Sequence, residues 1–165
     1  MDFQDKRYVI GIDLGTTNCA VSYVDLSREN KKDAVRLFSV PQLTGEGEFT
    51  AVDVLPSFLY MPGEYDISKE AMQHPWKKEK DRFVGVFARD HGSRIPARLV
   101  SSAKSWLCHA GADREAKILP FGSQIQDKVS PVQATAEYLK HVKKAWNHRV
   151  KDEDLDIVCG ADNIE

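Results

Sequence analysis

The amino-acid sequence predicts an α/β protein with a mixed sheet, and three observations support this prediction. The first 40 residues contain three short apolar segments separated by turns, a pattern typical of antiparallel strands. A strong helical pattern covers residues 130–149. One more apolar segment, residues 155–160, follows that helix, so we expect the helix and this last strand to return to the first strands as a crossover.

The chain begins with two apolar segments on either side of a tight turn. Residues 8–13 (Tyr-Val-Ile-Gly-Ile-Asp) have the character of a buried strand, and residues 19–26 form a second one. Residues 15–17 (Gly-Thr-Thr) lie between them. Apolar and polar residues alternate over residues 34–40, which predicts a third strand and completes an antiparallel meander.

The middle of the chain is less regular. Residues 41–50 are rich in Gly and Glu and predict a loop, whereas residues 52–61 are extended up to a Pro-Gly turn. We expect residues 66–81 to be irregular, and the apolar residues 83–89 suit either a strand or a helix. Residues 96–108 predict a helix that begins at a proline. Its apolar face consists of Leu99, Ala103, Trp106 and Leu107.

The helix expected over residues 130–149 has a clear start signal. Ser130 suits the N-cap, Pro131 the first helical position, and Gln133 completes a capping box. The expected buried stripe of this helix consists of Val132, Ala136, Leu139, Val142 and Trp146.

The amino-acid composition limits the classes of function that we expect for this protein. Of the 165 residues 42% are hydrophobic and 29% charged, which is typical of a globular protein with a sizeable core. The net charge of −2 gives no reason to expect a nucleic-acid or membrane partner. No apolar run approaches the roughly 20 residues of a membrane span, and the charged N-terminus lacks the apolar segment of a signal peptide. The three widely spaced cysteines fit free thiols, so we expect a cytoplasmic protein.

The first turn carries the chemistry of a phosphate site. Asp13 ends the first strand and can hold a metal ion or its water ligands. Gly15 lets backbone N–H groups approach a phosphate, and Thr16 and Thr17 add hydroxyl donors. The turn is not a Walker loop, because it lacks the Gly-Lys-Ser/Thr sequence and a strand follows it.

Together with the order of elements, three stretches make the chain resemble the Hsp70 chaperones, specifically the N-terminal lobe of their ATPase domain. Residues 11–18 (Gly-Ile-Asp-Leu-Gly-Thr-Thr-Asn) are similar to the family's first phosphate motif. Residues 55–58 (Leu-Pro-Ser-Phe) are similar to its Thr-Pro-Ser-Tyr/Phe segment. Residues 84–89 and 102–107 (Ser-Ala-Lys-Ser-Trp-Leu) are similar to its Val-Gly-x-x-Ala and Ala-Lys-Arg-Leu-Ile segments. The resemblance spans nearly the whole chain and indicates a divergent branch.

This resemblance implies a site for ATP or ADP with Mg²⁺. Asp13 would bind the water shell of the Mg²⁺ ion, and Lys104 would lie near the γ-phosphate, where it neutralises charge and orients the attacking water. The residues that would line the β- and γ-phosphates are Gly15, Thr16, Thr17 and Asn18. Without the resemblance, Lys104 would be interpreted as a solvated helix residue and Asn18 would suit a turn equally well.

The resemblance also implies a domain organisation. It predicts a ribonuclease H-like (actin-like ATPase) fold, with residues 1–40 and 128–165 forming an incomplete first lobe and residues 41–127 an inserted α+β subdomain. The family's second phosphate motif, Asp-x-Gly-Gly-Gly-Thr, does not occur in this sequence. We therefore expect this chain by itself to bind ATP poorly and to turn it over negligibly. Co-chaperones and unfolded polypeptide would be partners of a full-length parent.

Two other functions remain open. The chain could be the first lobe of a sugar or acetate-type kinase, because such kinases also begin with Asp-x-Gly-Thr-Thr, although residues 55–58 and the Ala-Lys-x-Trp-Leu stretch favour the chaperone. It could also be a non-catalytic interaction module. The DNA after codon 165 separates these hypotheses, because an open frame that continues with the second phosphate motif indicates an ATPase parent.

Overall fold

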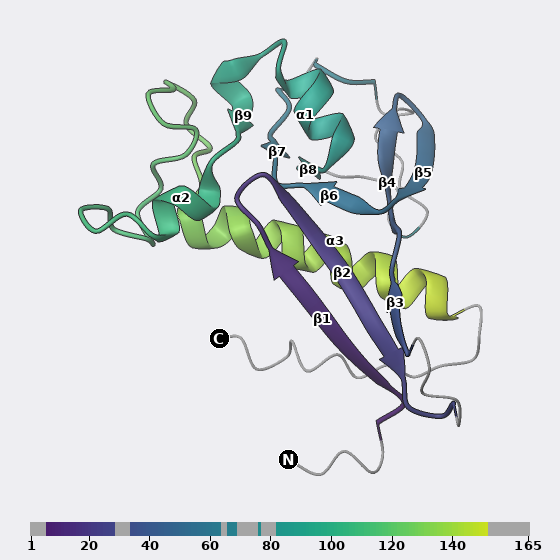
Figure 1. The fold of residues 1–165 in the computed structure, drawn as a ribbon. Coiled ribbons are helices and arrows are strands. Elements are labelled where there is room, and N and C mark those ends of the chain that lie inside the picture. The colour runs from purple at the N-terminus through teal and green to yellow at the C-terminus, as the bar shows by residue number, and fades with distance from the viewer. Residues whose placement is uncertain (1–5, 29–33, 64–65, 69–75, 77–81, 152–165) are drawn as a thin grey trace.

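The computed structural model of the chain describes residues 6–28, 34–63, 66–68, 76 and 82–151 (Figure 1). The elements in these ranges are, in order, β1 (Tyr8–Leu14), β2 (Asn18–Asp25), β3 (Val35–Leu37), β4 (Val40–Gly45), β5 (Glu48–Val52), β6 (Val54–Pro56), β7 (Leu59–Tyr60), β8 (Phe83–Val84), α1 (Val86–Gly92), the 3-10 helix η1 (Pro96–Arg98), β9 (Leu99–Val100), α2 (Ala103–Leu107) and α3 (Pro131–Lys151). They form a mixed α/β protein, in agreement with the predicted α/β class, and the strand pairs among the described residues are all antiparallel, so the mixed sheet stays a prediction.

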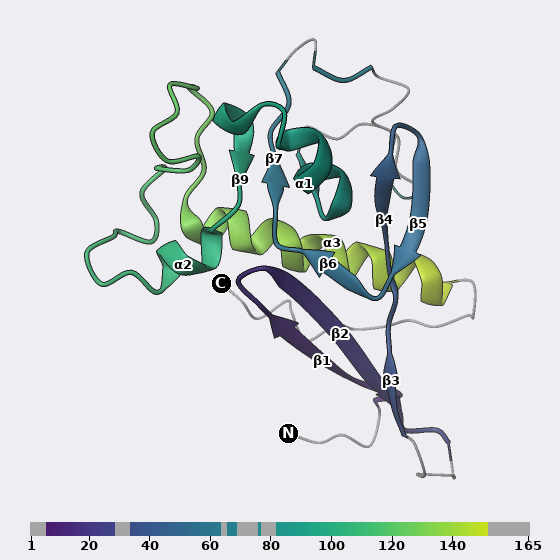
Figure 2. The same ribbon diagram turned by 45° about the horizontal axis from the view of Figure 1, so that its top comes forward.

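The main sheet is the predicted meander with one addition. β1 runs antiparallel to β2, so that Tyr8 lies opposite Asp25 and Leu14 opposite Cys19. β2 also pairs with two further strands: residues 22–24 pair with β3, and residues 18–20 pair with β6. α3 runs along one side of this sheet in both views (Figures 1 and 2). The predicted last strand, residues 155–160, lies outside the described residues.

The third strand is shorter than the predicted residues 34–40. β3 ends at Leu37, and Phe38 then turns into the core while its N–H donates to the carbonyl of Val21 (2.8 Å). Val35 and Leu37 keep 69% and 54% of their surface exposed. They lie opposite Val24 and Ser22 across the strand pair, on the sheet face that also carries Val9 and Gly11.

The prediction of a loop over residues 41–50 is wrong. This stretch forms most of the β4–β5 hairpin, in which Val40 lies opposite Val52 and Gly47 takes a positive φ of 71° at the turn. The core position of one glutamine in β4 is visible only in the tertiary structure. The Gln42 side chain donates to the carbonyl of Val54 (2.9 Å) and accepts from the N–H of Val86 (2.9 Å). A polar residue thus occupies a core position because its amide is fully used.

The prediction of one helix over residues 96–108 is also wrong. Pro96 does begin a helical turn, but η1 ends after one turn. β9 follows and pairs with β7, so that Val100 lies opposite Leu59 and Leu99 opposite Tyr60. Only α2 retains the helical pattern. The pairing with β7, a strand distant in sequence, overrides the local helical periodicity.

Residues 83–89, for which the sequence left two alternatives, contain both. β8 pairs with β7 and α1 follows at once. The junction is Gly85, whose φ of 86° is accessible to glycine. A Cβ atom there would collide with the side-chain oxygen of Gln42, so the close approach of these two residues requires glycine.

The long C-terminal helix is confirmed, together with its capping box. The N–H of Gln133 donates to Oγ of Ser130 and the N–H of Ser130 donates to Oε1 of Gln133, both over 3.1 Å. The predicted buried stripe is only partly correct: Val142 and Trp146 are buried, whereas Val132 is exposed and Ala136 and Leu139 are half-buried. The face that packs inward also uses polar residues, namely Thr135, Tyr138 and His141. None of the helices in the described part of the chain is both long and apolar enough to cross a bilayer.

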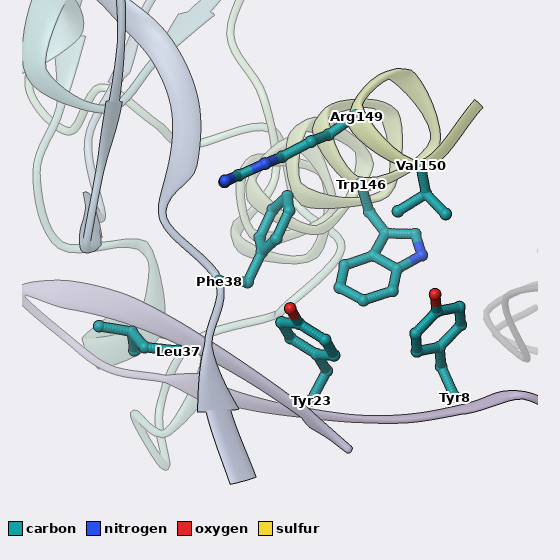
Figure 3. A pocket seen from close by; sticks show the side chains of 7 residues that line it. All are labelled: Tyr8, Tyr23, Leu37, Phe38, Trp146, Arg149 and Val150. Atoms are coloured by element: carbon teal, nitrogen blue, oxygen red, sulfur yellow. The ribbon is translucent and has the colours of Figure 1, made fainter. Parts of the chain in front are cut away.

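Aromatic rings join α3 to the sheet. Tyr8, Tyr23 and Phe38 surround the buried indole of Trp146, with ring centroids 5.0 to 5.4 Å from it (Figure 3). A cavity of about 120 Å³ opens beside them, also lined by Arg149. Tyr8 is the first residue of β1, whereas the Gly-Thr-Thr turn follows Leu14, the last residue of the same strand. The cavity is therefore distinct from the predicted phosphate site.

Candidate functional site

The candidate phosphate turn, which we define as residues 15–17, connects β1 to β2. Leu14 and Cys19 face each other as the last strand pair, and Asn18 begins β2. A Cβ atom on Gly15 would collide with the carbonyl oxygen of Asn18. Glycine is therefore required for the chain to reverse this tightly, a reason distinct from the predicted approach of backbone N–H groups to a phosphate.

Asp13 lies at the entrance to this turn. It is exposed, and it pairs with Ala20 across β1 and β2. Its neighbour Leu14 packs against the core, and side chains alternate along a strand, so Asp13 points to the opposite face of the sheet. The carboxylate is thus free of core packing and available to a metal ion or its water ligands.

The turn offers its polar groups to solvent. Thr16, Thr17 and Asn18 are all exposed, and Asn18 lies opposite Pro56 at the junction of β2 and β6. The sequence proposed these residues as phosphate ligands. The structure leaves them accessible to a ligand and brings them into one short segment.

Lys104 reaches the same region from a distant part of the sequence. It lies on α2, which packs on α3 beside the closed end of the β1–β2 hairpin in both views (Figures 1 and 2). Lys104 is half-buried, whereas its neighbour Ser105 is exposed. The aliphatic part of the Lys104 side chain is thus partly covered, as is usual for a lysine that keeps its ammonium group in water.

Both predicted charged residues, Asp13 and Lys104, affect the pKa of the Cys19 thiol. Burial raises the pKa of Cys19, the hydrogen bonds with Ser57 and with the backbone of Gly15 oppose this, the Asp13 carboxylate raises the pKa further, and Lys104 lowers it. Asp13 and Lys104, which are 91 positions apart in the sequence, therefore both contribute to the electrostatic environment at the start of β2, although Asp13 lies on the opposite sheet face from Cys19.

The site residue that sequence reasoning missed is Ser57. Its hydroxyl donates to the carbonyl of Gly15 (2.8 Å) and lies 3.3 Å from the Cys19 sulfur, and its N–H donates to the carbonyl of Thr17 (2.8 Å). Residues 55–58 were noted only for their resemblance to a family segment. The available signal was the serine after a proline at the end of an extended segment, which is a position suited to local backbone bonding.

The donor set fits a phosphate-bound Mg²⁺ ion better than a metal site built from protein alone. No group of three or more His, Cys, Asp or Glu side chains that could hold a metal ion occurs among the described residues. Mg²⁺ commonly keeps several waters and binds through one or two carboxylates together with substrate phosphates. Asp13 beside a phosphate turn matches that requirement.

No family model matches this chain, and no curated protein matches it significantly. The function must therefore be argued from the site itself and from the motifs quoted above.

Proposed function

We propose that this chain is the N-terminal part of an Hsp70-like, ATP-binding chaperone and provides the first phosphate-binding wall of its ATPase site. The observation that carries this proposal is the turn of residues 15–17, with exposed Asp13 before it and α2, the helix that carries Lys104, beside it (Figures 1 and 2). An acid, a glycine turn and a lysine are the groups that phosphoryl transfer requires for positioning and charge neutralisation.

Each residue has a defined role in this proposal. The N–H groups of residues 15–18 and the hydroxyls of Thr16 and Thr17 would bind the β- and γ-phosphates. Asp13 would hold Mg²⁺ through its waters, and Lys104 would neutralise the γ-phosphate. The bound Mg²⁺ would supply electrostatic stabilisation of the phosphate oxygens.

The fold is compatible with the first lobe of a ribonuclease H-like ATPase. β1, β2 and β3 form an antiparallel meander, and α3 runs along one side of it and packs on β1 and β2 through Trp146 (Figures 1 and 2). We keep the proposed division into a core of residues 1–40 and 128–165 and an inserted subdomain of residues 41–127. The cytoplasmic location and the chaperone partners of the parent belong to the same proposal.

The test is an NMR titration of the chain with Mg-ATP and, separately, with Mg-pyrophosphate. We expect shifts in the amides of residues 15–18 that weaken in Asp13→Asn and Lys104→Ala. The matched control is Lys117→Ala, which removes an exposed lysine on the loop after α2. Unshifted turn amides at millimolar ligand would refute the proposal.

The same titration separates the chaperone from the other two functions. A hexose or acetate that shifts amides near the turn would favour the kinase. The absence of a response to every one of these ligands would favour the interaction module.

A further inference from the structure

A single buried residue joins both arms of the candidate phosphate turn, one through its side chain and the other through its backbone N–H. Ser57 is 2% exposed, and it follows β6, which pairs with β2. Its hydroxyl donates to the carbonyl of Gly15 and its N–H donates to the carbonyl of Thr17, both over 2.8 Å. With the serine hydrogen used in this way, the Cys19 thiol donates to the serine oxygen over 3.3 Å. Ser57 therefore fixes the first and last residues of the turn at once.

Ser57 is in turn held by α3. The Tyr138 hydroxyl donates to the carbonyl oxygen of Ser57 over 3.0 Å, across 81 residues of sequence. Tyr138 is 2% exposed, so water cannot readily replace this bond. The contact connects the middle of the long helix to the turn through one intermediate residue.

The same helix supports the other side of the site. α2, which carries Lys104, packs against α3. α3 thus contacts the phosphate turn indirectly, through the Tyr138–Ser57 hydrogen bond. It also packs against α2, the helix that carries Lys104. The relative placement of the two halves of this site depends on one rigid element.

We propose that Ser57 and Tyr138 are positioning residues that hold the turn of residues 15–17 in the conformation in which it binds phosphate. This inference rests on the proposed function for its ligand, but the conformational effect can be measured without one. Neither side chain needs to touch the ligand. They order the exposed turn before the ligand arrives. The entropy cost of ordering the turn is therefore not incurred during binding.

The test compares Tyr138→Phe and Ser57→Ala with the wild-type chain. Tyr138→Phe keeps the buried ring and removes only the hydroxyl. The matched control is Tyr60→Phe, because Tyr60 is equally buried and its hydroxyl donates to Asp66 over 2.9 Å, outside the candidate site. All four proteins are first compared by chemical denaturation, so that any effect of global stability is known.

The first measurement is made without ligand. Loss of one buried hydrogen bond should make the Ser57 amide of Tyr138→Phe exchange its hydrogen about fivefold faster, beyond any change in global stability. ¹⁵N relaxation should show greater mobility of residues 15–17 in both test variants. Tyr60→Phe should leave both readings at wild-type values. Equal behaviour of Tyr138→Phe and Tyr60→Phe would overturn the inference.

The second measurement is the affinity for Mg-pyrophosphate. We expect the dissociation constant to rise about fivefold in Tyr138→Phe and at least as much in Ser57→Ala, and to stay unchanged in Tyr60→Phe. Unchanged affinity with a more mobile turn would overturn the inference and leave the proposed function in place. A wild-type chain that binds no pyrophosphate would refute the proposed function, while the exchange data would still decide whether the two residues hold the turn.

Discussion

The Trp146 indole packs edge-on against the ring of Tyr23, with centroids 5.1 Å apart and ring planes at 73°. Tyr23 belongs to the central strand of the sheet and Trp146 to the last part of α3. Phe38 and Tyr8 complete the cluster (Figure 3). The last part of α3 is therefore attached to the sheet by an aromatic cluster that is separate from the Tyr138–Ser57 contact nearer the start of the helix.

Replacing Trp146 should destabilise the fold strongly. The side chain is 2% exposed, and Trp146→Ala would leave a cavity among aromatic rings. We expect a loss of about 3–5 kcal/mol in the free energy of unfolding, measured by urea denaturation. Phe121→Ala, at a position that is 70% exposed, should stay within about 0.5 kcal/mol of wild type. Similar losses in the two variants would contradict the assigned role of Trp146.

The capping box of α3 yields a second prediction. Ser130→Ala removes the hydroxyl that accepts the Gln133 N–H, so one amide of the first turn loses its partner. We expect a loss of about 1 kcal/mol in the free energy of unfolding. Ser101→Ala changes an exposed serine outside any helix and should have little effect. An unchanged denaturation midpoint in Ser130→Ala would show that the cap adds no stability.

Stability should fall in alkaline solution. Burial raises the pKa of the Cys19 thiol and of the Tyr138 hydroxyl above their ordinary values. The unfolded chain, with the ordinary pKa values, then releases these protons at lower pH than the folded chain does. Unfolding therefore releases protons, and the free energy of unfolding falls as the pH rises above about 8.5 for the thiol and about 10 for the tyrosine.

The alkaline decline can be assigned by mutation. Tyr138→Phe should make the decline above about pH 10 less steep, with the rest due to Tyr60, whose pKa burial also raises, although the stability of the variant near neutral pH is lower. Equilibrium urea denaturation from pH 7 to 11, followed by fluorescence, gives the comparison. A decline of the same steepness in Tyr138→Phe and wild type would show that this hydroxyl does not contribute.

Mg-ATP should bind this chain weakly. Asp13, Thr16 and Thr17 are all exposed, and contacts between exposed charged groups in water contribute little free energy. We expect the affinity to decrease further as salt is added, because the contacts are electrostatic. Isothermal titration calorimetry measures it directly. A submicromolar dissociation constant would show that the chain encloses more of the nucleotide than these residues do.

Local patterns predicted the fold where neighbouring residues determine the structure. The β1–β2 hairpin and α3 were predicted because their apolar periodicity and cap residues lie within the elements themselves. β9 was missed because Leu99 and Val100 form a strand only by pairing with β7, some 40 residues earlier. β4 and β5 were missed because the Gly and Glu residues of this stretch are typical of a loop, and the position that Gln42 occupies in the core is visible only in the tertiary structure.

For the candidate site, too, local sequence motifs could be recognised, whereas residues that depend on distant contacts could not. Residues 13–18 form one continuous motif and were predicted from sequence. Lys104 was proposed only through a family resemblance, because nothing in its own helix indicates a phosphate. Ser57 was missed because its partners, Gly15 and Tyr138, lie 42 and 81 residues away. Contacts of that sequence separation leave no trace in local periodicity.

The Gln42 side chain substitutes for a peptide group. One primary amide supplies both the donor that Val54 needs and the acceptor that Val86 needs, as a backbone unit of an adjacent strand would. A carboxylate lacks the donor and an aliphatic side chain lacks both groups. Gly85 leaves room for this amide and would have to change with it. Positions 42 and 85 should therefore vary together, with divergent sequences retaining Gln beside Gly or replacing both.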